Sequence, residues 1–128
     1  SIANGGTLMK PYVLDRVQSA AGEEVKKFLP EAYGSLMTAD EAAKLNDLMT
    51  LVVTEGTGSA LRDASYQAAG KTGSAEFETG KETHAWFTGY APAEDPQIAV
   101  TVIVEEGGSG GRAAAPIARQ MFDQYLLR

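Results

Sequence analysis

The chain has 128 residues, of which 44% are hydrophobic and 22% are charged, and its formal net charge at pH 7 is −6. A chain of this length forms one domain with a real hydrophobic core, and its composition is that of an ordinary globular protein. The negative charge, without any cluster of Lys and Arg, argues against nucleic-acid binding.

The cysteine and histidine counts limit the chemistry further. The chain has no cysteine, which excludes disulfides and thiolate metal sites, and His84 is its only histidine, which excludes a multi-histidine site. We therefore expect neither a metal nor a cofactor. We also expect no membrane span and no signal peptide. Because the chain opens at Ser1 without Met, we interpret it as a processed or excised piece.

The N-terminal quarter predicts a small β-hairpin. Residues 3–6 read Ala-Asn-Gly-Gly, which is typical of a turn. Residues 7–17 favour a strand, although Pro11 confines that strand to a sheet edge. A turn around Gly22 then leads to a second short strand over residues 24–29. We expect residues 30–36 to be a connector.

The clearest helix begins at Thr38, which forms a capping box with Glu41 three residues later. Apolar residues then recur at spacings of three and four, and Gly56 and Gly58 predict the end of the helix. The spacing predicts one stripe that faces the core, made of Ala42, Leu45, Leu48, Met49 and Val52.

Three strands joined by short loops follow and predict an antiparallel meander. They are expected over residues 68–77, 84–91 and 98–104. The last is almost entirely β-branched, which is typical of an interior strand covered on both faces. In the middle strand, Trp86 and Phe87 must point to opposite faces.

A terminal helix completes the predicted fold. Residues 107–111 read as a flexible glycine-serine link, and Pro116 then lies in the first helical turn. A broad apolar stripe on this helix comprises Ile117, Ala118, Met121, Phe122, Tyr125 and Leu126. We predict an α+β fold, with about three core strands, a small N-terminal hairpin, and two helices that cover both faces of the sheet.

The first meander strand carries the pattern most typical of a binding site, Gly70-Lys71-Thr72-Gly73-Ser74-Ala75. In an extended strand alternate side chains face the same way, so Thr72 and Ser74 share one face and Lys71 and Gly73 the other. Two hydroxyls and a nearby ammonium suit a carboxylate, and the glycine lets a ligand lie close to the backbone. The strand therefore predicts one wall of an anion-binding site.

Three interpretations of this stretch compete. A phosphate loop needs a glycine five residues before Gly70, where Ser65 stands, and a preceding β-branched strand, which is absent. The second interpretation is the Lys-Thr-Gly element of active-site serine penicillin-binding proteins and β-lactamases. The third is an ordinary turn or edge strand.

Other segments agree with the second interpretation. Taken in order, they resemble the C-terminal part of a penicillin-binding protein transpeptidase domain over essentially all of residues 1–128. The resemblance implies a β-lactamase/transpeptidase-like fold and a peptidoglycan D,D-transpeptidase that cross-links stem peptides by serine acyl transfer and binds β-lactams. The segments are Ile2-Ala3-Asn4-Gly5-Gly6, Met9-Lys10-Pro11-Tyr12, Gly56-Thr57-Gly58, Gly70-Lys71-Thr72-Gly73-Ser74-Ala75, His84-Ala85-Trp86-Phe87 and Gly89-Tyr90-Ala91-Pro92.

Two motifs of that family are missing. No serine is followed by Lys at the third place, no Ser-x-Asn occurs, and Thr7-Leu8-Met9-Lys10 matches in spacing only. In the family both motifs lie upstream of the Ala-Asn-Gly-Gly element. We therefore expect the nucleophile to lie on an upstream part of the domain, absent or on a separate chain, and this chain alone to be inactive. The alternative is a non-catalytic β-lactam sensor or structural fragment.

The resemblance implies a role for each residue of the central strand. Thr72 and Ser74 would hold the carboxylate of a D-alanyl-D-alanine stem peptide or of a β-lactam, with Gly73 and Ala75 beside it. Lys71 and Ser74 would be the catalytic residues: Lys71 assists proton transfer and the Ser74 backbone N–H donates to the oxyanion. The resemblance also implies a membrane-anchored protein on the extracytoplasmic face of a bacterial cytoplasmic membrane. We expect the chain to pair with the upstream part or to self-associate.

Overall fold

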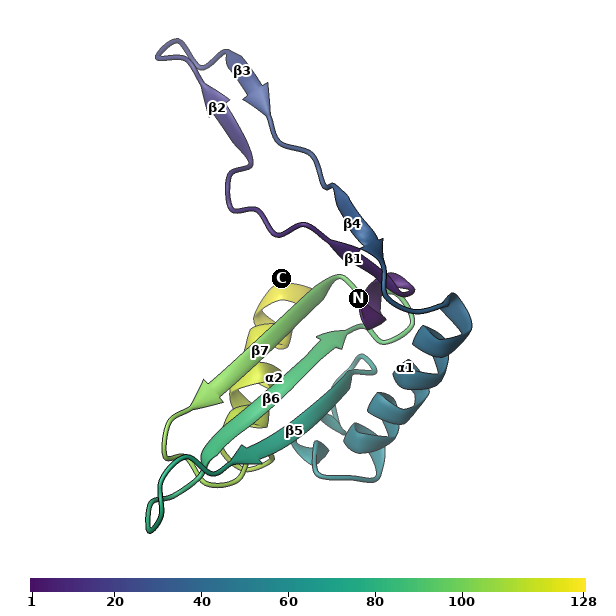
Figure 1. Ribbon diagram of the computed structural model, residues 1–128, viewed down its shortest axis with the longest axis vertical. Coiled ribbons are helices and arrows are strands. Elements are labelled where there is room, and N and C mark those ends of the chain that lie inside the picture. Colours follow the sequence, from purple (N-terminus) through teal and green to yellow (C-terminus); the bar gives the residue numbers. More distant parts are fainter.

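The computed structural model describes residues 1–128, and its three antiparallel sheets and two α-helices confirm the predicted α+β class (Figure 1). No helix in it is long and apolar enough to cross a membrane. In chain order the elements are η1 (Ile2–Asn4), β1 (Thr7–Met9), β2 (Arg16–Gln18), β3 (Glu24–Lys27), β4 (Ala32–Ser35), α1 (Ala39–Thr54), η2 (Ser59–Leu61), β5 (Ala69–Ala75), β6 (His84–Ala91), β7 (Ile98–Val104) and α2 (Ala114–Leu126).

The predicted small hairpin is a long arm that projects from the body (Figure 1). β2 pairs with β3 near its tip, and β1 pairs with β4 near its base. The expected connector over residues 30–36 is therefore wrong, because β4 lies within it. Pro11 and Pro30 have no N–H for a ladder, so the pairing is interrupted between the two short sheets.

Helix α1 begins as predicted, but its core stripe is partly wrong. The Glu41 N–H donates to Thr38 Oγ1 at 3.3 Å, and the Thr38 N–H donates to Glu41 Oε2 at 2.8 Å. Leu48, however, is 58% exposed, and the buried residues of the helix are Ala42 and Val53. The reason is that α1 packs beside β5 at the edge of the sheet, so it buries only a narrow face.

Strands β5, β6 and β7 form the predicted antiparallel meander, in that spatial order. Phe87 lies opposite Thr72 on one side and Val102 on the other, and this face packs on α2.

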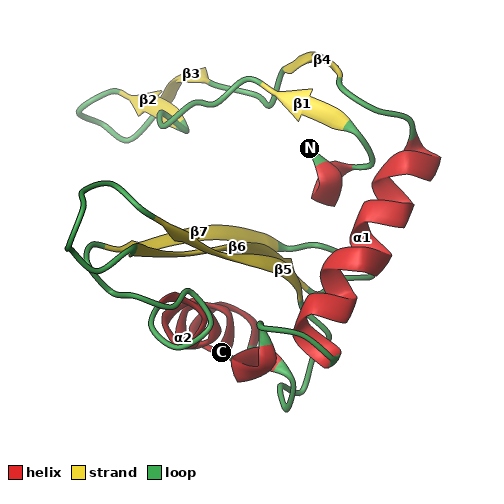
Figure 2. Cartoon of the chain, turned by 60° about the horizontal axis from the view of Figure 1, so that its bottom comes forward, coloured by secondary structure: helices red, strands yellow, loops and turns green.

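On the opposite face of the sheet, Ile2 of η1 and Met49 of α1 pack against Ala69 and Tyr90. The Tyr90 hydroxyl donates to Asn46 of α1 at 2.8 Å. No α-helix lies over the rest of that face (Figure 2), so the prediction that helices cover both faces is only partly right. β7 is an edge strand, and its Ile103 is 45% exposed.

Helix α2 supplies the core beneath the sheet. Ala118 and Phe122 are fully buried, whereas the other row of the predicted stripe, Ile117, Met121 and Tyr125, is 41–56% exposed. A single covered face needs only one row of apolar side chains, which explains why half of the stripe lies in solvent.

A side-chain network fixes α2 to the segment that leads into β5. The Tyr66 hydroxyl donates to Asp123 Oδ1 at 2.7 Å, and Arg119 Nε donates to both oxygens of the same carboxylate. Burial, with the adjacent Asp123 carboxylate, raises the pKa of Tyr66 far above its ordinary value of 10. Tyr66 therefore stays protonated and keeps donating at any physiological pH.

Candidate functional site

Strand β5 lies at a free edge of the three-stranded sheet, with α1 beside it (Figure 1). Its register confirms the predicted alternation: Thr72 and Ser74 face the same side as Phe87 and Ala85, and Lys71 faces the open side with Thr88. Thr72 is 9% exposed, whereas the side chains of Lys71 and Ser74 reach solvent. An edge strand that presents both hydroxyls can form one wall of a binding site.

Lys71 folds back onto its own strand. Its Nζ donates to the Thr72 carbonyl oxygen at 2.6 Å, and no carboxylate lies within ion-pair distance of it. A lysine ammonium has three donors. Its charge and two of those donors therefore remain available to an anion beside β5.

The Ser74 hydroxyl already has a partner. Ser74 Oγ donates to the Gly108 carbonyl oxygen at 3.0 Å, and Thr83 Oγ1 donates to the same oxygen at 2.7 Å. A serine hydroxyl has one proton. Ser74 must therefore turn away from Gly108 before it can donate to a carboxylate, and the Thr83 hydrogen bond keeps the Gly108 carbonyl satisfied when it does.

Thr57 belongs to the site, although sequence reasoning missed it. Its Oγ1 lies 2.5 Å from Thr72 Oγ1, and these two hydroxyls are hydrogen-bonded. The segment Gly56-Thr57-Gly58 did draw attention in the sequence, but we interpreted it only as the end of a helix and as part of the family resemblance. The contact joins two segments 15 residues apart, so no local pattern predicts it.

The predicted flexible link at residues 107–111 is instead packed against the site. Gly110 is buried, and a Cβ on it would lie 2.2 Å from the Trp86 carbonyl oxygen and 2.5 Å from that of Gly73. A Cβ on Gly111 would lie 2.4 Å from the Thr57 carbonyl oxygen. The glycines are therefore required for close backbone approach, and they tie β5, β6 and Thr57 together.

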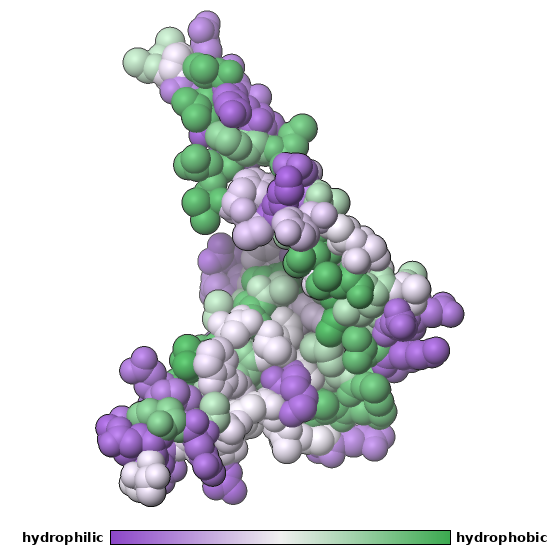
Figure 3. All heavy atoms as spheres, in the orientation of Figure 1, coloured by the Kyte–Doolittle hydropathy of each residue, from purple (hydrophilic) through white to green (hydrophobic).

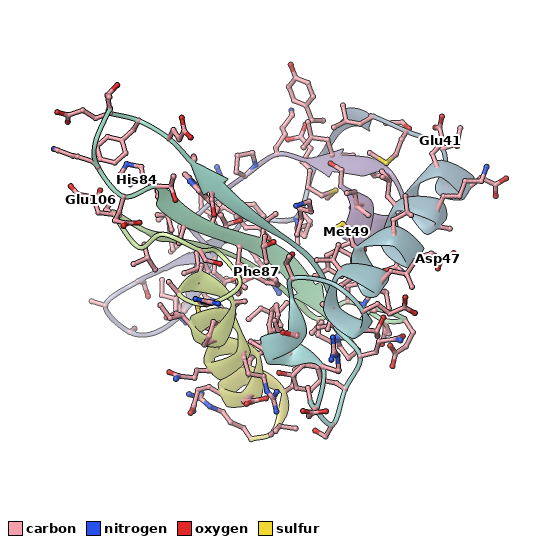
Figure 4. The ribbon with its side chains drawn as sticks, turned by 90° about the horizontal axis from the view of Figure 1, so that it is seen from below. Glu41, Asp47, Met49, His84, Phe87 and Glu106 are labelled. Carbon is pink, nitrogen blue, oxygen red and sulfur yellow. The ribbon has the colours of Figure 1, made fainter.

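His84 has a structural position at the far end of the sheet. Its ring stacks on Phe77 with centroids 4.0 Å apart, and its Nδ1 accepts a hydrogen bond from the Glu106 N–H at 3.0 Å. Figure 4 shows His84 and Glu106 together at the turn end of the strands, apart from α1. These two contacts hold the ring in place at the end of the sheet.

The face of β5 that carries Thr72 and Ser74 lines none of the main hollows of the molecule. A hollow of about 330 Å³ does exist on the open side of the sheet, but it is lined by Ile2, Met49, Tyr90 and their neighbours and by no residue of 71–75. Figure 3 looks onto this side, between the arm and the body. Gly70-Lys71-Thr72 lies inside a strand and not in a loop before a helix, so the phosphate-loop interpretation has no structural support.

The fold and this strand together define a class of protein. Residues 1–123 match the family described as "Penicillin binding protein transpeptidase domain". The chain therefore belongs to the penicillin-binding protein transpeptidase domain family.

Curated relatives agree and are much longer. The chain is 35% identical to "Peptidoglycan D,D-transpeptidase MrdA" of Haemophilus influenzae, over 98% of this chain and 22% of that protein. It is 38% identical to "Peptidoglycan D,D-transpeptidase PbpA" of Mycolicibacterium smegmatis, over 93% of this chain and 26% of that protein. The chain thus spans about a quarter of the length of these relatives.

Solved structures show the same fold. The ceftriaxone acyl-enzyme complex of penicillin-binding protein A from M. tuberculosis has a TM-score of 0.89 and 32% identity, and the match covers 98% of this chain and 30% of that one. The D,D-transpeptidase domain of a peptidoglycan glycosyltransferase from Eggerthella lenta has a TM-score of 0.86 and 34% identity, covering 99% and 30%. This likeness confirms the transpeptidase-like fold predicted from the sequence.

Proposed function

We propose that residues 1–128 are the C-terminal part of a peptidoglycan D,D-transpeptidase, and that they supply the carboxylate-binding side of its serine acyl-transfer site. The observation that carries the proposal is β5: Thr72 and Ser74 present hydroxyls from one face of an edge strand, with the unpaired Lys71 ammonium beside them. The relatives named as D,D-transpeptidases support the reaction class.

In this proposal the substrate is a stem peptide that ends in D-alanyl-D-alanine. Thr72 and Ser74 donate to its terminal carboxylate, while Gly73 and Ala75 leave room for the peptide along the strand. A serine hydroxyl attacks the penultimate carbonyl, an ester bond forms, the amide bond to the terminal D-alanine breaks, and the serine proton passes to the departing D-alanine amine. The acceptor amine of a second stem peptide then attacks the ester carbonyl, a new amide bond forms, the ester bond breaks, and a proton of the amine returns to the serine oxygen.

The nucleophile comes from outside these residues, because neither Ser-x-x-Lys nor Ser-x-Asn occurs in them. The part that carries it is the partner this chain requires. We propose that the Ser74 backbone N–H is one oxyanion donor. Loss of one such donor slows acyl transfer by about a hundred- to a thousandfold. In the complete site, the Ser-x-Asn segment would lie near Lys71. The Lys71 ammonium would supply positive potential there and assist proton transfer.

β-Lactams are the second ligand class. Several structural neighbours are acyl-enzyme complexes with β-lactams, including ceftriaxone and penicillin G. A β-lactam carries a carboxylate near its reactive carbonyl, so the same two hydroxyls would hold it. We therefore propose that the whole protein acts on the extracytoplasmic face of a bacterial cytoplasmic membrane.

Labelled penicillin tests the proposal. The full protein should form a covalent adduct, and residues 1–128 alone should not, because they hold no nucleophile. Replacing both hydroxyls, as Thr72→Val with Ser74→Ala, should slow adduct formation by about a hundredfold, since each hydrogen bond to a charged group contributes about tenfold. Thr54→Val, which removes a hydroxyl from α1, is the matched control.

Two results would contradict the proposal. One is an adduct on the isolated 128-residue chain, and the other is a wild-type rate in the double variant. A full protein that binds penicillin reversibly without an adduct would support the β-lactam sensor instead.

A further inference from the structure

Thr57 and Thr72 form a hydroxyl pair at the carboxylate wall. Their Oγ1 atoms lie 2.5 Å apart, and Thr72 Oγ1 has no other hydrogen-bond partner in the structure. Thr72 as a residue is 9% exposed, and Thr57 is the partner of its hydroxyl. The pair lies on the α2 side of β5, the side to which Ser74 also points.

The backbone holds Thr57 in place from two directions. On one side the Gly56 N–H donates to the Leu51 carbonyl oxygen at 3.1 Å, and the Gly58 N–H donates to that of Val52 at 2.8 Å. On the other side Gly111 packs on the Thr57 carbonyl so closely that a Cβ would lie 2.4 Å from it. Thr57 thus lies in the turn between α1 and η2, and the hydrogen bonds of its neighbours and the packing of Gly111 hold that turn against Thr72.

The count of hydroxyl protons decides what the pair can do. Two hydroxyls hold two protons, and the bond between them uses one. When Thr57 donates, the Thr72 proton is free for an anion, whereas when Thr72 donates it is not. A carboxylate only accepts, so its arrival selects the first arrangement. In such a chain of hydrogen bonds, donation from Thr57 to Thr72 also polarises the Thr72 hydroxyl and makes it a stronger donor to the carboxylate.

We propose that Thr57 is a positioning residue for carboxylate recognition: it donates to Thr72 Oγ1 and thereby directs the Thr72 proton to the carboxylate of the peptide or β-lactam. This inference rests on the proposed function, because it takes Thr72 to be the group that holds the carboxylate. It predicts that Thr57 affects ligands that carry a free carboxylate and not ligands in which that group is masked.

The test compares benzylpenicillin with its methyl ester, using the full protein and the rate of covalent adduct formation. In the wild type, the ratio of the adduct-formation rate with the acid to that with the ester measures how much the free carboxylate contributes to the reaction. Thr57→Val should lower the rate with the acid by about tenfold and leave the rate with the ester unchanged. Thr57→Ser, which keeps the hydroxyl, should retain most of the preference.

Thr101→Val is the matched control. Thr101 forms a similar pair with Thr88, with Oγ1 atoms 2.9 Å apart, on the open face of the sheet. Its loss should leave both rates unchanged. A Thr57→Val variant in which acid and ester rates fall together would show that Thr57 only supports the fold, and the inference would be overturned.

Comparing Thr72→Val with Thr57→Val distinguishes the role of Thr57 from that of Thr72. If Thr72→Val removes the acid preference and Thr57→Val does not, only the role of Thr57 is wrong. If the wild type forms no adduct, or Thr72→Val keeps the full preference, both proposals are wrong.

Discussion

Gly110 shows how the site depends on a residue that carries no functional group. Its backbone lies against Gly73 of β5 and Trp86 of β6, where a Cβ has no room. We predict that Gly110→Ala forces these strands apart, lowers the free energy of unfolding by about 1–3 kcal/mol, and slows penicillin adduct formation. Urea unfolding and adduct kinetics measure the two effects.

Gly34→Ala is the control for that substitution. Gly34 lies in β4 of the arm, and a Cβ there would meet nothing within 4 Å. This variant should unfold and react as the wild type does. Equal behaviour of the Gly110 and Gly34 variants would show that close packing at Gly110 does not hold the site.

The shared orientation of Thr72 and Ser74 could be predicted from the alternation of side chains along a strand. Thr72 and Ser74 share a face because the strand is regular, so their relation follows from spacing alone. The partners of both hydroxyls were not predictable in this way. Thr57 and Gly108 reach them from segments 15 and 34 residues away, and only the packing of glycines brings those segments close.

Helix α1 has a charge-dependent start. Hydrogen bonds from the backbone N–H and the hydroxyl of Thr38 lower the pKa of Glu41 below its ordinary value of 4.5. A lowered pKa means that the cap stabilises the fold above the ordinary pKa, and that this contribution is lost as the pH falls through the lowered one. We predict that Glu41→Gln lowers the urea midpoint at pH 7 and that the difference from wild type shrinks as the pH falls through the lowered pKa of Glu41.

Asp47→Asn provides the comparison. Figure 4 shows Asp47 further along the same helix, away from the capping box at Glu41. The Asp47→Asn substitution removes one negative charge, as Glu41→Gln does, but leaves the hydrogen bonds at the helix start intact. Its effect on the urea midpoint at pH 7 should therefore be smaller. If Glu41→Gln destabilises equally at pH 7 and below the lowered pKa of Glu41, the cap is not responsible.

The positions of the strands with a typical β composition were predicted correctly, but the burial and the pairing of several elements were not. β6 and β7 occupy the predicted residues 84–91 and 98–104, because their composition favours strands wherever they lie. The burial of α1 and β7 was wrong because it depends on neighbours. α1 stands at the sheet edge, and one face of β7 has no cover. β4 was missed because it is paired only through a distant strand, β1.

The chain exposes large apolar side chains on its arm and on the open face of its sheet, and exposed apolar surface of this kind favours association. On the arm, Val13 is 99% exposed and Leu29 70%, and on the open face of the sheet Ile103 is 45% exposed. Figure 3 shows apolar atoms along the arm. We predict that the isolated 128-residue chain self-associates, with a mass by light scattering that rises with concentration.

Substitutions locate the surface responsible. Ile103→Lys should weaken association if the open sheet face is the contact, and Val13→Lys should weaken it if the arm is. A monodisperse monomer at high concentration would show that neither surface drives association in the isolated chain.

The central claim is that β5 holds the carboxylate of the ligand, and a crystal structure of the full protein after reaction with benzylpenicillin tests it most directly. We predict that the penicillin carboxylate lies within hydrogen-bond distance, about 2.5–3.2 Å, of both Thr72 Oγ1 and Ser74 Oγ. We also predict that Ser74 has turned away from Gly108. An acylated serine whose ligand carboxylate contacts neither hydroxyl would contradict the account.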